Sequence, residues 1–130
     1  MFIEEGPAFG LKGPSSMNTK HSDFMIHHNL RVWRRALALV KLVHENLPAD
    51  AGLRDQVRRS SKSVGGNIAE GCAMDSRAMR FKHYKIARGS VVETVAHYEM
   101  AEVIGEDLPV AEVRSHGAAI AAMLTKMVGR

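Results

Sequence analysis

Cysteine, aromatic residues and long apolar runs are all scarce in this chain of 130 residues. A single cysteine, Cys72, cannot form an internal disulfide, which excludes a disulfide framework and is typical of a reducing compartment. No apolar run approaches the roughly 20 residues that a membrane span requires. The N-terminal stretch MFIEEGPAFG has neither the basic start nor the apolar core of a signal peptide. These absences predict a soluble, cytoplasmic protein with no membrane partner.

Signals for β-strands are sparse as well. β-branched residues are few, aromatic residues make up 5% of the chain, and no segment alternates cleanly between apolar and polar positions. The chain length suits one domain that buries a core without covalent staples. Residues 1–24 are rich in Gly, Pro and Ser and show little apolar periodicity. We therefore expect a flexible tail over 1–24 and one folded domain over 25–130.

Four segments of that domain repeat apolar residues at helical spacing. Their expected boundaries are capping or helix-breaking residues: Pro48 after the first, Asp50 and Gly71 around the second, Asp75 or Ser76 and Gly105 around the third, and Asp107 before the fourth. Their expected buried stripes are Leu30, Trp33, Leu37, Val40 and Leu47, widened by Ala36 and Val43; Leu53, Val57, Val64 and Ile68; Tyr84, Ala87, Val91, Val95, Tyr98 and Ala101; and Val113, Ile120, Leu124 and Met127. Because the connections are short, the sequence predicts an all-α, antiparallel up-and-down four-helix bundle.

Small and polar residues interrupt the second helix in the stretch SSKSVGGNIAEG. Glycine inside a helix is unfavourable by about 1 kcal/mol relative to alanine, so these residues predict a close approach of another helix. Asn67 and Glu70 lie at the edge of the buried stripe. We interpret them as a buried polar clamp, with Arg58, Arg59 or Arg88 as the cation, rather than as a ligand or catalytic carboxylate, because no second catalytic group accompanies them.

Basic residues form rows along the first three helices, whereas the end of the third is acidic. A surface for the phosphates of nucleic acid is one interpretation, with Tyr84 as a stacking group; contact between subunits and an ordinary solvated face are the others, and Tyr84 fits the core better. The candidate phosphate-binding residues are Arg31, Arg34, Arg35, Arg54, Arg58, Lys62, Arg77, Arg80, Lys85 and Arg88.

Patterns of metal and catalytic residues are weak. Glu93 and His97, like Glu112 and His116, are four residues apart, whereas di-metal bundles use a Glu-x-x-His spacing of three. Cys72 has no base near it in the sequence, and the serines of the second helix lack the context of a nucleophile. We expect no metal, no cofactor and no enzymatic activity.

Three stretches carry a family resemblance: LRVWRRALALV, DQVRRSSKSVGGNIAEG and IARGSVVETVAHYEMAEVIG. Together they resemble the four helix bundle protein family, which includes proteins encoded in intervening sequences of bacterial 23S ribosomal RNA genes. The resemblance covers about Leu30 to Arg130. Its motif residues in this chain are Trp33, Arg58, Arg59, Asn67, Glu70, Gly71, Gly89, Ser90 and Glu93.

The resemblance implies an antiparallel four-helix bundle that assembles into a ring-shaped homopentamer, and it supplies no catalytic role for the motif residues. Related accessory proteins of diversity-generating retroelements bind nucleic acid and a reverse transcriptase. This chain has Gly65-Gly66 where relatives commonly have Pro or another small residue, which puts the straightness of the second helix in doubt. The leading hypothesis is a non-enzymatic oligomeric scaffold that binds RNA or DNA; the alternative is a protein-interaction adaptor, such as an accessory subunit of a retroelement reverse transcriptase.

Overall fold

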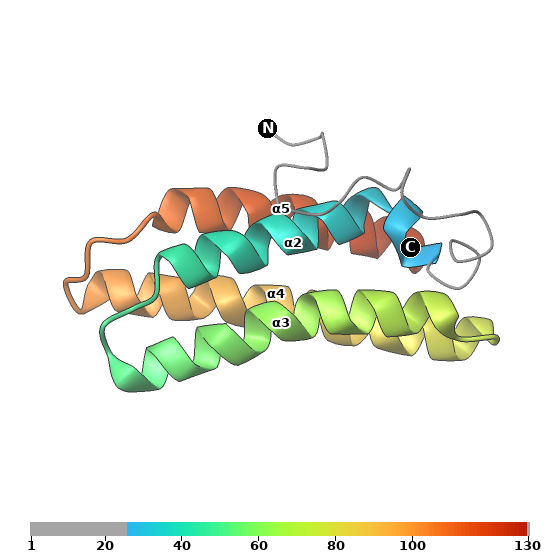
Figure 1. The fold of residues 1–130 in the computed structure, drawn as a ribbon, viewed down its shortest axis with the longest axis horizontal. Helices are drawn as coiled ribbons and strands as arrows, with labels where there is room; N and C mark the ends of the chain where they lie inside the picture. Colours follow the sequence, from blue (N-terminus) through green and yellow to red (C-terminus); the bar gives the residue numbers. More distant parts are fainter. Residues whose placement is uncertain (1–25, 130) are drawn as a thin grey trace, which may run out of the picture.

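The computed structural model describes residues 26–129 of the chain, so the tail predicted over 1–24 lies outside the described residues. A short 3-10 helix, η3 (Ile26–Asn29), precedes four α-helices, α2 (Arg31–Glu45), α3 (Ala51–Ala73), α4 (Arg77–Val103) and α5 (Val110–Met127). The described residues contain no strand. The all-α fold with four helices is therefore confirmed (Figure 1).

The helix starts follow local capping chemistry. The Asp50 carboxylate accepts a hydrogen bond from the Leu53 amide at 3.0 Å, and the Ser76 hydroxyl accepts one from the Met79 amide at 3.1 Å. Asp50 is thus confirmed as a cap, and Ser76 rather than Asp75 caps α4. The cap predicted at Asp107 is wrong, since α5 begins at Val110 after Pro109. Proline disfavours helical backbone in the residue before it, so Leu108 and the residues that precede it stay outside the helix.

Two glycines predicted as helix ends behave differently. Gly105 follows the end of α4 with φ of +100°, a left-handed conformation that suits glycine. Gly71 does not end α3, which continues to Ala73, and this prediction is wrong. α3 also continues without interruption across Gly65-Gly66. The packing of Gly71 against α4 explains its presence better than a turn does.

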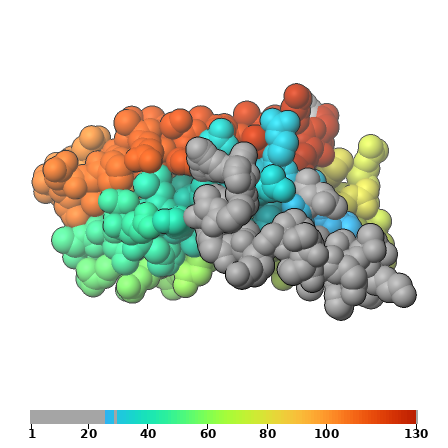
Figure 2. Space-filling model, turned by 45° about the horizontal axis from the view of Figure 1, so that its top comes forward, coloured from blue at the N-terminus to red at the C-terminus, as the bar shows by residue number. Residues whose placement is uncertain are grey.

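The helices lie side by side, with α3 against both α2 and α4, and α5 against both α4 and α2 (Figures 1 and 2). The connections α2–α3 and α4–α5 share one end of the molecule, and the α3–α4 connection lies at the other, near η3 and the end of α5 (Figure 1). The Glu106 carboxylate joins the first two connections by accepting hydrogen bonds from the amides of Ala49 and Asp50, at 2.7 and 3.0 Å. A carboxylate at this place also suits the positive N-terminus of α3.

The core is apolar and draws on all four helices. Its fully or nearly fully buried members are Val32, Ala36, Leu39, Val43, Val57, Val64, Ile68, Tyr84, Ala87, Val91, Tyr98, Ala101, Val110, Val113, Ile120 and Leu124. The stripes predicted for α3, α4 and α5 are largely confirmed, with Leu53, Val95 and Met127 half-buried at their edges.

The stripe predicted for α2 is wrong, because the helix buries a neighbouring face, rotated about its axis from the predicted one. Ala36 and Val43, expected at its edge, are fully buried, whereas Trp33 is half-buried. The Trp33 indole lies instead over Gly65, where an added Cβ would come within 3.3 Å of Cζ3. Two overlapping apolar stripes satisfy helical spacing in this segment, so periodicity alone could not choose between them.

Candidate functional site

Small residues bring α3 close to its neighbours, as the sequence predicted. An added Cβ at Gly71 would lie 2.6 Å from Tyr84 Cε1, which is too close for any carbon contact. Gly65 is buried against α2. Gly66 is exposed, and a Cβ added there would meet nothing within 4 Å. Gly65 and Gly71 therefore serve packing, and Gly66 does not.

A line of polar side chains joins α3 to α4. The hydroxyls of Ser60 and Thr94 are 2.6 Å apart in the buried interior, and those of Ser63 and Ser90 are 2.8 Å apart. Residue numbers rise along α3 as they fall along α4 in these contacts, so the two helices run in opposite directions. Asn67 extends the line by donating from Nδ2 to the Ser63 carbonyl at 2.9 Å. Such satisfied buried hydrogen bonds fix the register of two helices.

The arginine clamp predicted for Glu70 is wrong. The Glu70 side chain is 66% exposed, and its partner is His83, with Oε1 to Nδ1 at 3.5 Å. The same His83 nitrogen lies 3.0 Å from Asn67 Oδ1. Arg58 and Arg59 are exposed, and they lie about three turns before Glu70 along α3, too far away to pair with it. His83 was not predicted as this partner. Its place follows from the antiparallel helices, because His83 and Asn67 are equally far along the chain from Asp75 in the connecting turn.

One face of α4 exposes apolar side chains that the sequence reading overlooked. They are Ile86, Val92, Met100 and Val103 of α4 and Ile104 directly after its end, with exposures from 43% to 85%. We call these five residues the α4 apolar face. Gly89 lies between Ile86 and Val92 in the same helix, where an added Cβ would meet nothing within 4 Å, and Glu93 is exposed next to Val92. Apolar side chains that gather on one exposed helix face are typical of protein contact surfaces.

Half of the predicted phosphate-binding side chains have partners within the bundle. Arg54 donates to the Ala49 carbonyl at 3.0 Å, and Arg88 donates to Thr125 Oγ1 at 3.0 Å. Arg80 donates to the Met74 and Asp75 carbonyls at 3.2 and 3.0 Å, where it covers the end of α3.

Two more of the predicted phosphate-binding residues, Arg35 and Arg77, contact aromatic rings of the bundle. The Arg35 guanidinium lies 3.5 Å from His116 Nδ1, and Arg77 lies 5.5 Å from the centre of the Phe81 ring. Burial, together with the Arg35 charge, lowers the pKa of His116, which favours the neutral imidazole.

The remaining predicted residues are exposed, and the described residues show no ion pair for them. These residues are Arg31, Arg34, Arg58, Lys62 and Lys85. The tertiary structure brings most of the predicted basic residues to one end. The start of α2, the start of α4 and the end of α5 meet there (Figure 1). We call this the basic end, and its members are Arg31, Arg34, Arg35, Arg77, Arg80, Lys82, Lys85, Arg88 and Lys126. Lys126 belongs to no row of basic residues and could not be found from spacing.

The opposite end is acidic. It carries Glu45, Asp50, Asp55, Glu99, Glu102, Glu106, Asp107 and Glu112. Arg114 offsets part of this charge by donating to Glu99 at 3.0 Å. Arg54 lies toward this end, while Arg58 and Lys62 lie near the middle of α3, so the predicted row Arg54, Arg58 and Lys62 is not part of the basic end.

The described residues offer little for metal binding or nucleophilic catalysis. No group of three or more His, Cys, Asp or Glu side chains within 26–129 is placed to hold a metal ion. Burial raises the pKa of the Cys72 thiol, which lies 3.7 Å from the Tyr84 hydroxyl, so the reactive thiolate is disfavoured. Tyr84 itself is buried in the core and cannot stack on a base. Over the same residues, no helix is long and apolar enough to cross a membrane.

These features define a class of protein: an all-α bundle with charge segregated along its length and one exposed apolar helix face. The chain belongs to the family described as 23S rRNA-intervening sequence protein, which matches residues 28–125. The family resemblance read from the three sequence stretches is thereby confirmed. A comparison with curated proteins finds no match.

Proposed function

We propose that this protein is a non-enzymatic scaffold that assembles with copies of itself and binds the phosphates of RNA or DNA at its basic end. The observation that carries the proposal is the convergence of basic residues from α2, α4 and α5 at one end, where Glu70 and Asp75 are the nearby acids among residues 26–129. Phosphates gain affinity from such a surface because each neutralised phosphate releases a condensed counterion. The acidic end repels the same phosphates, so binding is oriented along the bundle axis.

The alternation of helix directions supports an antiparallel up-and-down bundle as the protomer, and this topology is what brings distant basic segments together. In a ring of parallel protomers, the basic ends would face the same way and their fields would add. Several weak phosphate contacts on one ring then produce strong binding. A cytoplasmic location stays a prediction.

Two double variants with equal charge loss test phosphate binding. Lys82→Gln with Lys85→Gln removes two exposed cations from the basic end, and Arg58→Gln with Arg59→Gln removes two from α3 outside it. We expect the first pair to lower duplex affinity at 0.1 M salt by roughly tenfold or more. It should also make the slope of log affinity against log salt less steep by about 1.8, because each of the two lost phosphate contacts contributes about 0.9 to that slope. We expect the second pair to change both quantities much less.

Fluorescence anisotropy with a labelled duplex and a structured RNA, across a salt series, measures both quantities. Equal effects of the two double variants would contradict binding at the basic end. No binding by the unaltered protein at low salt would contradict the nucleic-acid proposal as a whole.

The α4 apolar face supports the self-assembly part of the proposal. Val92 is a 60% exposed member of this face, near the middle of α4 along its length, so Val92→Lys would bury a charge in the contact between copies. We expect this variant to weaken the self-association constant by at least about 100-fold. Ser115→Lys, at an exposed position of α5, adds the same charge elsewhere and should leave assembly intact. Sedimentation velocity over a concentration series measures the result, and an unchanged mass for Val92→Lys would exclude this face.

The same observation also favours a second candidate function, an adaptor that binds another protein such as a reverse transcriptase. An apolar helix face with acidic neighbours suits a protein partner with a basic rim. A Val92→Lys variant that keeps its self-assembly but loses a co-purifying polymerase would favour the adaptor.

A further inference from the structure

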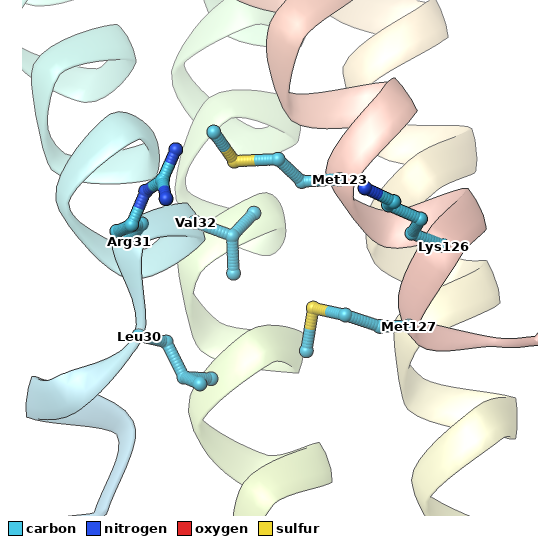
Figure 3. Close-up of a pocket in the computed structure, with 6 residues that line it drawn as sticks. All are labelled: Leu30, Arg31, Val32, Met123, Lys126 and Met127. Carbon is cyan, nitrogen blue, oxygen red and sulfur yellow. The ribbon is translucent and has the colours of Figure 1, made fainter.

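A hollow opens at the basic end between the start of α2 and the end of α5 (Figure 3). Its volume is about 260 Å³, and it is lined by Leu30, Arg31, Val32, Met123, Lys126 and Met127. The side chains of Met123 and Met127 reach from α5 toward α2, and Arg31 extends along the opposite side (Figure 3). The hollow therefore combines an apolar lining with a cation from each helix.

We propose that this hollow receives one unpaired base of a nucleic-acid strand, while Arg31 and Lys126 contact the phosphates on either side of it. The inference rests on the proposed function and adds a preference to it: strands with an accessible base bind more tightly than a continuous duplex. Duplex bases are stacked and paired, so a continuous duplex can offer only its phosphates to the same end.

The chemistry of the lining matches a base better than a purely apolar or purely anionic ligand. Methionine sulfur makes favourable contacts with aromatic rings, and Met123 and Met127 are placed one helical turn apart to contact one ring. Arg31 is exposed, and a guanidinium can also stack on a base. A purely apolar ligand would leave both cations without a partner, and an inorganic anion would leave the apolar lining in water.

The size of the hollow limits what can enter. Sites for drug-sized ligands usually measure about 300–1,000 Å³, so this hollow is suited to one ring system rather than to a larger cofactor. Its position among the basic-end residues also supplies phosphate contacts for the rest of the strand. A single base held beside a basic surface is a common arrangement for single-stranded recognition.

The test compares two RNA hairpins of equal length and charge, one fully paired and one with a single bulged base. We expect the unaltered protein to prefer the bulged hairpin by roughly tenfold at 0.15 M salt. Met127→Gln keeps the side-chain length and the net charge but places an amide in the apolar lining. It should reduce the preference by about fivefold and leave both the affinity for the paired hairpin and the salt slope unchanged.

Met79→Gln is the matched control, because Met79 lies in the first turn of α4 at the same end, is 40% exposed and does not line the hollow. Met123→Gln is a second variant in the hollow, and thermal melting shows that each variant is folded.

Equal binding of the two hairpins, or equal effects of Met127→Gln and Met79→Gln, would overturn the inference while leaving phosphate binding standing. If Met127→Gln changed the oligomer mass but not the preference for the bulged hairpin, the hollow would be a contact between copies, and this outcome would overturn the inference as well. If neither hairpin binds, the proposed function and this inference fail together.

Discussion

Replacing Gly71 with alanine is expected to lower the free energy of unfolding by up to about 2 kcal/mol. The added Cβ would meet Tyr84 at 2.6 Å from Cε1 and 2.9 Å from Cδ1, and His83 at 3.2 Å from its Cβ. The Tyr84 ring is buried in the core, and the Cβ of His83 moves only with the backbone of α4, so neither neighbour can yield cheaply. Overpacking of this kind costs about 1–3 kcal/mol, and the better helix propensity of alanine offsets about 1 kcal/mol of it.

The same substitution at Gly66 provides the control. Gly66 is exposed in the same helix, and a Cβ added there would meet nothing within 4 Å. Gly66→Ala should therefore raise the free energy of unfolding by up to about 1 kcal/mol, because alanine has the better helix propensity. Urea unfolding followed by circular dichroism measures both variants, at one protein concentration because self-assembly would couple to folding. Similar effects of the two substitutions would show that α3 and α4 do not approach closely at Gly71.

Alkaline pH is expected to remove as much as about 2–3 kcal/mol of stability through Tyr98 alone. Tyr98 is fully buried, and its hydroxyl donates to the carbonyls of Asn46 at 2.8 Å and Val43 at 3.3 Å. Burial raises the pKa of Tyr98 to about 12, whereas in the unfolded chain it ionises near 10. Because the folded pKa is the higher one, the stabilisation is fully present below pH 10. It is lost as the pH rises from about 10 to 12.

Tyr98→Phe separates this effect from the titration of lysines, which both proteins share. At pH 8 the variant should be less stable by about 1–2 kcal/mol, because the Asn46 carbonyl loses its buried donor. Between pH 10 and 12 the unaltered protein should lose about 2–3 kcal/mol more stability than the variant, so its stability falls to that of the variant or below it. Urea unfolding at pH 8, 10, 11 and 12 measures the difference, and parallel curves for the two proteins would contradict the assignment.

Two of the three expected helix caps and three of the four buried stripes could be predicted from the sequence because they depend on neighbours along the chain, whereas the cap expected at Asp107 was wrong. Asp50 and Ser76 bond to amides three residues away, and Gly105 needs only its own φ. The end expected at Gly71 failed because a glycine can serve either a turn or a close contact, and only the position of Tyr84 distinguishes the two.

The candidate site was harder to predict because it joins distant segments. Residues of the basic end were recognised as basic rows on α2 and α4, but α3 contributes little to it and Lys126 of α5 completes it. The hollow between Val32 and Met127 could not be predicted from local spacing, since its two walls come from the first and the last α-helix of the chain. His83, the partner of Asn67 and Glu70, was overlooked for the same reason.

The sequence alone predicts the helical class, a cap at Asp50, a second cap at Asp75 or Ser76, the family and the overall excess of basic residues. The packing of the helices sets which face of α2 is buried, where the excess charge gathers and which apolar residues of α4 stay exposed. The physical reason is the range of the interactions. Caps and periodicity act within a turn or two of one helix, whereas the direction in which each helix crosses the bundle decides whether charges from distant segments meet at one end.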